Sequence, residues 1–285
     1  MTSSTLRFLD ARAHLAHGCR PTLDYGFAKG NPAIGVQLAE IGPLSGVLPL
    51  AFARQSETDY VLTALHGFAD GHNLLVDEQG RWLGTYLPMG LRAYPLTLAP
   101  LAPAADGALR YGLAFQHASG LYREAPDVTL GERRFFDDAG NLQPWLARHA
   151  DMLQAAMAQR AVTARAVEAL RDAQLLIPWQ LDQPDAGEPE RRLPPGLYRV
   201  NEERLKALTG AQLEPLHQAN ALALAYAQLI SMGRVQMLHR LAQGRDRRAA
   251  LTQAPSPAAN PAPAEPGALE QLIGAGQSDT IRFNW

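Results

Sequence analysis

The chain has 285 residues, of which 47% are hydrophobic and 19% are charged. This apolar content suffices for a packed core, which excludes wholesale disorder. With 26 Lys and Arg against 28 Asp and Glu, the formal charge of -2 argues against a nucleic-acid-binding protein, which normally presents a strongly basic face. The single cysteine, Cys19, excludes an internal disulfide framework and a cysteine-based zinc cluster.

Targeting and membrane-spanning patterns are absent from the sequence. Residues 1–10 lack the basic start and the apolar run of a secretory signal peptide. No stretch approaches the roughly 18 consecutive apolar residues that a transmembrane helix requires. We therefore expect a cytoplasmic protein without a transmembrane segment.

Short apolar runs separated by turn residues fill the stretch from about 47 to 116. The segment 77–80, between two of these runs, ends in glycine, as a hairpin loop often does. The spacing leaves no room for the helices of βαβ units, so we expect an antiparallel meander. The expected strands are 47–53, 60–65, 73–76, 81–86 and 109–115.

The pattern becomes helical at Pro144. Apolar residues recur at three- and four-residue steps over 144–175, and a proline suits the first helical turn. A loop over 183–195 precedes a short strand at 196–200, after which Asn201 can serve as an N-cap. A long helix is expected from about 209 to 243, with a core-directed face of Leu213, Leu216, Leu222, Ala223, Tyr226, Leu229, Ile230, Val235, Met237 and Leu238.

These patterns predict an α+β fold, in which an antiparallel β-sheet or meander from the N-terminal half packs with long helices from the C-terminal half, followed by a disordered C-terminal tail. Residues 253–267 hold five prolines and no large apolar side chain, which is typical of a semi-extended linker. We therefore assign residues 1–250 to a single domain, 251–267 to a Pro/Ala-rich linker and 268–285 to a flexible tail that ends in Phe-Asn-Trp.

Sequence motifs for catalysis, metal binding or cofactor binding are missing. The nucleophile elbow Gly-x-Ser-x-Gly, the phosphate-binding P-loop and the dinucleotide fingerprint do not occur. A metal site needs three or four convergent ligands, and the histidines lack such spacing. We assign no catalytic residue, no metal ligand and no cofactor. The histidines considered are His66, His72, His117, His149, His217 and His239.

The tail carries the most distinctive pattern, because a long proline-rich spacer separates two aromatic residues from the domain. Trp and other aromatic residues are favoured anchors in interfaces, since they bury a large area with few rotatable bonds. Three interpretations stay open: a segment read or modified by a partner, a segment folded back on its own domain, and a segment without a role. The candidate residues are Ile281, Arg282, Phe283, Asn284 and Trp285.

Several blocks of the sequence resemble the SapC family of bacterial proteins. Among them are Tyr-Gly-Phe-Ala-Lys-Gly-Asn-Pro-Ala at 25–33 and Gly-Leu-Tyr-Arg-Val-Asn-Glu-Glu-Arg-Leu at 196–205. The resemblance covers about 22–243 in the right order and implies no established catalytic motif. It does imply an association with surface-layer transport. Genes of this family often neighbour those of TonB-dependent receptors, flavin-dependent tryptophan-halogenase-like enzymes and cupin-like proteins. Further similar blocks lie at 48–53, 73–82, 86–95, 136–144 and 221–229.

We favour a non-catalytic scaffold or adaptor that presents its tail to a protein partner. Joined to the gene neighbourhood that the resemblance implies, this makes the tail a docking site for, or a substrate of, a flavin-dependent tryptophan-halogenase-like enzyme. One alternative is an accessory protein for surface-layer or receptor export. Another is an enzyme whose site lies in loop-like sequence dense in polar and aromatic residues. Its candidates are Tyr25, Lys29, Asn31, Arg92 and Tyr94.

Overall fold

A computed structural model describes residues 6–21, 24–102, 109–181 and 191–253. By internal contacts the chain divides into two units, Met1–Ala242 and Gln243–Trp285. The described sheets and hydrophobic clusters all belong to the first unit, whose boundary falls within the last helix. The predicted linker and tail, including Ile281 to Trp285, lie outside the described residues.

The largest sheet is five-stranded, with the order β10-β11-β4-β5-β3, and all of its neighbouring strands pair antiparallel. Its central pair, β4 and β5, aligns Leu50 with Ala64 and Arg54 with Tyr60. Short β3 is an edge strand, paired only with the C-terminal half of β5. The strands are β3 (Ala33–Gly35), β4 (Leu50–Arg54), β5 (Tyr60–Leu65), β10 (Leu176–Pro178) and β11 (Leu197–Val200).

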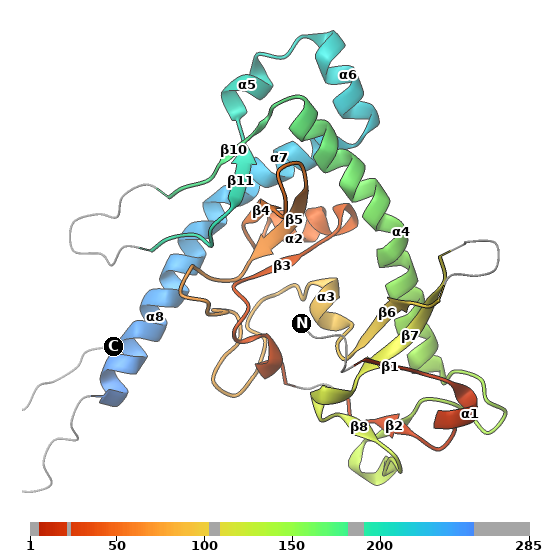
Figure 1. Cartoon of the computed structure of the whole chain (residues 1–285). Coiled ribbons are helices and arrows are strands. Elements are labelled where there is room, and N and C mark those ends of the chain that lie inside the picture. Colours follow the sequence, from red (N-terminus) through yellow and green to blue (C-terminus); the bar gives the residue numbers. More distant parts are fainter. Residues whose placement is uncertain (1–5, 22–23, 103–108, 182–190, 254–285) are drawn as a thin grey trace, which may run out of the picture. The chain divides into compact units, whose positions relative to one another are not determined.

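Helices cover this sheet and enclose the main core. The 29-residue α4 (Pro144–Asp172) contacts β5, and α7 (Ala221–Ser231) contacts β4 and β11 (Figure 1). Fully buried Phe52, Leu62 and Leu170 belong to the core between them. Shorter helices flank this layer: α2 (Ile41–Ser45), α5 (Glu202–Lys206), α6 (Gly210–Gln218), the 3-10 helices η3 (Leu38–Glu40) and η6 (Met232–Arg234), and the start of α8 (Val235–Gln253).

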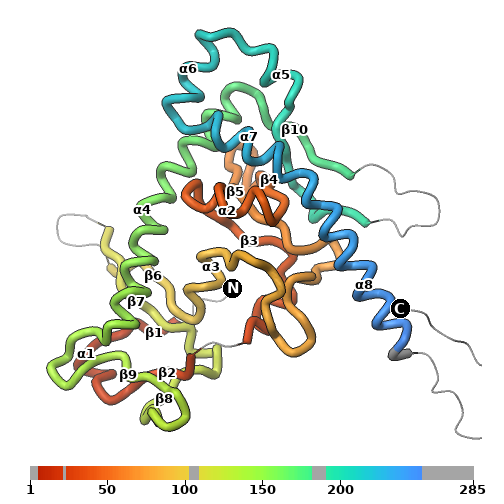
Figure 2. The backbone as a smooth tube through the Cα atoms, turned by 180° about the vertical axis from the view of Figure 1, so that it is seen from behind, coloured from red at the N-terminus to blue at the C-terminus, as the bar shows by residue number. Residues whose placement is uncertain are grey.

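Two three-stranded sheets form the rest of the unit, ordered β1-β7-β6 and β8-β2-β9. Helix α4 also contacts β6, so one helix packs on both the large sheet and a small one, as the reverse view in Figure 2 shows. Phe115, Phe135 and Leu146 form the core here. The strands are β1 (Leu6–Phe8), β2 (Gly18–Cys19), β6 (Leu96–Pro100), β7 (Tyr111–Gln116), β8 (Tyr122–Arg123) and β9 (Arg133–Arg134).

The remaining helical turns are short. Three of them connect strands of the small sheets, one lies between β2 and β3, and one precedes β6. They are α1 (Ala11–His14), α3 (Met89–Arg92), η2 (Gly26–Ala28), η4 (His117–Ser119) and η5 (Val128–Leu130). Among the described residues, no helix combines the length and the apolar composition that crossing a membrane requires.

The α+β fold class is confirmed, with corrections inside the 47–116 stretch. Its strands do not form one meander, because β4 and β5 join the large sheet while β6 and β7 join a small one. The hairpin expected around 77–80 has its turn, with Gly80 at φ 80°, but only a single bridge from Val76 to Trp82. Residues 73–76 are all buried rather than alternately exposed, so they do not present the two faces of a surface strand.

The helix expected over about 209–243 is broken into α6, α7, η6 and α8. Asn220, at φ 59°, ends α6 and redirects the chain. The predicted core face is also partly wrong, since Tyr226 is 52% exposed and Ile230 is 68% exposed. The buried face of α7 instead includes the polar Gln228 and Ser231. Hydrophobicity alone misassigned the face because polar side chains occupy part of the core.

Candidate functional site

Aromatic side chains from distant parts of the first unit gather around the candidate residues Tyr25 and Tyr94. The ring of Tyr25 lies 6.1 Å from that of Phe27 and 6.2 Å from that of Trp82, measured between centroids. Phe27 stacks on Tyr94 at 3.7 Å with an interplanar angle of 12°. Together with Tyr86, whose carbonyl accepts a hydrogen bond from Trp82 Nε1 at 3.1 Å, we call these residues the aromatic cluster. Each of its five members is half-buried.

Arg92 adds a positive charge at the edge of the aromatic cluster. Its guanidinium lies 5.5 Å from the centre of the Tyr86 ring and donates to the carbonyl of Leu87 at 2.9 Å. A guanidinium over an aromatic face is attracted by the ring quadrupole. The Arg92 side chain is therefore oriented while it remains exposed.

Lys29 and Asn31 lie beside the cluster and are exposed. Lys29 Nζ donates to the carbonyl of Glu78 at 2.8 Å, and the Asn31 N–H donates to the carbonyl of Ala28 at 3.1 Å. Buried Asn73 holds the same turn, because its N–H donates to Lys29 and its Nδ2 donates to Ala28. The structure thus brings the five predicted residues into one region, with Lys29 and Asn31 at its rim.

Glu40, which sequence reasoning missed, fixes the position of Tyr86. This carboxylate is 2% exposed. Its Oε1 accepts hydrogen bonds from the Tyr86 hydroxyl at 3.1 Å and the Met89 N–H at 2.7 Å, while Oε2 accepts from the Gln37 N–H at 3.2 Å. Burial and the nearby Glu40 charge raise the pKa of Tyr86, which therefore stays a hydrogen-bond donor at neutral pH. Donors from three residues thus compensate the cost of burying this carboxylate.

His66 is the buried polar group next to the cluster. Its ring meets Trp82 edge-to-face at 5.5 Å and 90°, and neither ring nitrogen has a hydrogen-bond partner among the described residues. Burial lowers the pKa of His66 to about 4, and an interaction with the backbone of Asn31 offsets part of this drop. The imidazole is therefore neutral at physiological pH.

A second group of rings surrounds Tyr122. The Tyr122 hydroxyl is hydrogen-bonded to His17 Nδ1, and the ring of His117 stacks on it at 4.9 Å. His14 meets both His17 and Tyr122 edge-on. The sequence offered no signal for this group, because its members come from two segments about a hundred positions apart. No set of three or more His, Cys, Asp or Glu within the described ranges is arranged to hold a metal ion.

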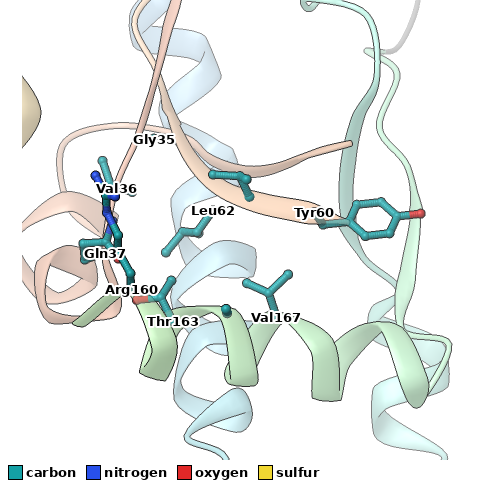
Figure 3. A pocket seen from close by; sticks show the side chains of 10 residues that line it. Gly35, Val36, Gln37, Tyr60, Leu62, Arg160, Thr163 and Val167 are labelled. Carbon is teal, nitrogen blue, oxygen red and sulfur yellow. The ribbon is translucent and has the colours of Figure 1, made fainter. Parts of the chain in front are cut away.

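A groove lies on another part of the unit, between β5 and α4 (Figure 3). Its volume is about 380 Å³, within the range of ligand sites. None of the five predicted residues lines it. Its lining comes from Gly35, Val36, Gln37, Tyr60, Val61, Leu62, Arg160, Thr163, Ala164 and Val167.

The aromatic cluster has the composition of a binding surface. Half-buried Tyr and Trp with a neighbouring Arg are the residues enriched in protein interfaces. The carboxylate in contact with the cluster, that of Glu40, is held by donors from three residues.

Comparison with known proteins then identifies the family. The family model SapC matches residues 9–238. The chain belongs to the SapC family. No curated protein and no solved structure matches it. The SapC match contains the aromatic cluster, the groove and the residues around Tyr122, and it ends before the segment 253–267.

Proposed function

We propose that this SapC protein is a non-catalytic adaptor, in which the folded domain carries the segment 281–285 as a docking peptide for a protein partner. The observation that carries the proposal is the agreement of two boundaries. The SapC match ends at residue 238 and the first compact unit ends at Ala242, whereas the proline-rich stretch begins after both. The segment 281–285 thus lies beyond the family domain along the chain.

The described hydrophobic clusters all lie within the first compact unit. Each cluster is formed by residues between Leu9 and Ala242. The proposal assigns the apolar side chains of Phe283 and Trp285 to a partner. The proline-rich composition of 253–267 predicts a semi-rigid spacer that keeps such a peptide within reach of the partner.

The partner's binding pocket must accept an indole and a phenyl ring two residues apart. Aromatic anchors of this kind contribute most of the binding energy in many interfaces. A flavin-dependent enzyme of the tryptophan-halogenase type, the partner class that family resemblance suggests, would recognise an indole. The same segment could serve that enzyme as a docking site or, through the ring of Trp285, as a substrate.

Affinity capture from the native host tests the proposal. The baits are the full chain, the variant Phe283→Ala with Trp285→Ala, and a control with Leu269→Ala and Leu272→Ala in the same tail. We expect one partner to be recovered with the full chain and the control, and to be depleted at least about tenfold with the 283/285 variant, because a lost aromatic anchor costs about 2 kcal/mol or more.

Equal recovery of every protein with all three baits would contradict the adaptor proposal. The identity of the captured protein decides between the finer versions, since an envelope protein supports the export alternative and a flavin enzyme supports docking. A mass increase localised to Trp285 in the protein from its own host would make the segment a substrate.

A further inference from the structure

The groove exists because the chain that follows β3 leaves β5 and turns toward α4. Beyond Gly35 the last contact between the strands is the Val36 N–H, which donates to the Leu62 carbonyl at 2.9 Å. Two residues later the Leu38 N–H donates to Thr163 Oγ1 of α4 at 2.9 Å. The departing segment, β5 and α4 therefore enclose a groove instead of a continuous sheet (Figure 3).

One wall of the groove is an unpaired strand edge. Backbone groups alternate sides along an antiparallel strand, so the N–H and C=O of Tyr60 face the same side as those of Leu62. Strand β3 pairs only with Thr63–Leu65, which leaves Tyr60 without a neighbouring strand on that side in the described structure. Val61, between them, is 41% exposed. This edge is a template for one more strand.

The floor of the groove is apolar. Val36, Leu62 and Val167 are buried members of the main core that reach its lining. An occupant that brings an apolar side chain would cover this floor.

Arg160 supplies a positive charge to the groove. Among the described residues that line the groove, Arg160 is the only charged one. Its side chain is exposed and forms no ion pair or hydrogen bond within the described part of the chain. Figure 3 places its side chain beside Gln37 and Thr163. The groove is therefore complementary to a negative charge.

We propose that this groove binds an acidic partner peptide in extended conformation, which adds a strand to the edge of β5. Only such a peptide uses the three features together: the unpaired backbone of Tyr60, the apolar floor and the cation of Arg160. Side chains two residues apart on a strand face the same side, so an apolar residue and a Glu at that spacing would both face α4. This site is independent of the tail and would give the adaptor a second point of attachment.

Amide chemical shifts of the full chain, titrated with acetyl-Thr-Val-Thr-Glu-Thr-amide, test the proposal. We expect shifts at Tyr60, Leu62 and Val36, and a weaker affinity when Lys replaces the Glu of the peptide. In Arg160→Gln the affinity for the acidic peptide should fall about two- to fivefold, the upper part of the range for an exposed ion pair, and the preference for Glu should vanish. Arg165→Gln, also exposed on α4, is the matched control and should change neither.

The strand geometry has a separate test in two peptides N-methylated at alternate residues. The peptide methylated at the residues whose N–H groups face β5 should not bind. The peptide methylated at the residues whose N–H groups point away from β5 should bind as the unmodified peptide does. The proposal is overturned if the acidic peptide leaves Tyr60 and Leu62 unshifted, if the Lys peptide binds equally well, or if both N-methylated peptides bind. Equal binding by N-acetylglutamate alone would also overturn it.

Discussion

At the scale of single residues, His66 and Glu40 show two ways to bury a polar side chain. Glu40 has hydrogen-bond donors from three residues, so its burial is compensated. His66 has no such partner among the described residues and is accommodated by remaining uncharged. Burial therefore favours the neutral form of His66.

This asymmetry makes His66 an acid-sensitive point of the fold. Its pKa is about 4 in the folded chain and 6.5 in its ordinary state, so the unfolded chain binds more protons between these values and stability falls as pH falls. From pH 7.5 to pH 5 the loss from this residue is about 2 kcal/mol. In His66→Phe, which keeps an aromatic ring against Trp82, this part of the loss should disappear.

Urea unfolding of both proteins at several pH values measures the effect. A cost of fitting the larger phenyl ring would lower stability equally at every pH and would leave the difference in pH dependence intact. Parallel curves for the two proteins between pH 7.5 and pH 5 would show that His66 is not the acid-sensitive group.

At the scale of elements, Gln228 of α7 replaces a missing pair of strand hydrogen bonds. Strands β11 and β4 pair Leu197 with Ala53 and Tyr198 with Phe52. In this register the continued ladder would place Val200 opposite Leu50. The Gln228 amide bridges them instead, accepting from the Val200 N–H at 3.0 Å and donating to the Leu50 carbonyl at 3.1 Å.

Gln228→Ala should destabilise the domain by about 2–4 kcal/mol, because it leaves two backbone groups unpaired and opens a cavity in the core. Gln154→Ala, at an exposed position of α4, should change stability by less than about 0.5 kcal/mol. Chemical denaturation of both variants provides the comparison. A Gln228→Ala variant as stable as the Gln154→Ala control would refute the bridging role.

The same elements show which features of the fold a local sequence pattern can predict. Strand β5 and helix α4 were predictable, because one is a clean run of β-forming residues and the other has uninterrupted helical periodicity starting at Pro144. Asn201 is the N-cap expected from sequence, accepting from the Arg204 N–H. The face of α7 was not predictable, since Gln228 is buried only because two strands separate beside it.

The candidate site, too, was predictable from the sequence only in part. Tyr25, Arg92 and Tyr94 were recognisable as aromatic and polar residues in loop-like sequence. Their association depends on Phe27 and Trp82, whose contacts join segments about fifty or more residues apart. The groove between β5 and α4 could not be predicted, because it arises from where β3 leaves the sheet, and no local pattern encodes that departure.

At the scale of the whole molecule, the SapC match covers residues 9–238 of the 285, and the proposed function adds the segment 281–285 as a docking peptide. The described sheets and the hydrophobic clusters beneath their covering helices extend no further than the end of the first compact unit at Ala242. In the proposed function, stability belongs to the domain and partner recognition belongs to 281–285. These two properties should therefore change independently on mutation.

The most direct test of this division is the thermal unfolding midpoint of a chain that lacks residues 281–285, compared with that of the full chain. We predict midpoints within about 1 °C of each other, because the proposed function assigns the removed residues to the partner and not to the domain core. A kilocalorie of lost stability shifts the midpoint of a domain of this size by about 2–4 °C. A drop of about 5 °C or more would show that the segment packs into the domain, which would contradict its role as a peptide held out for a partner.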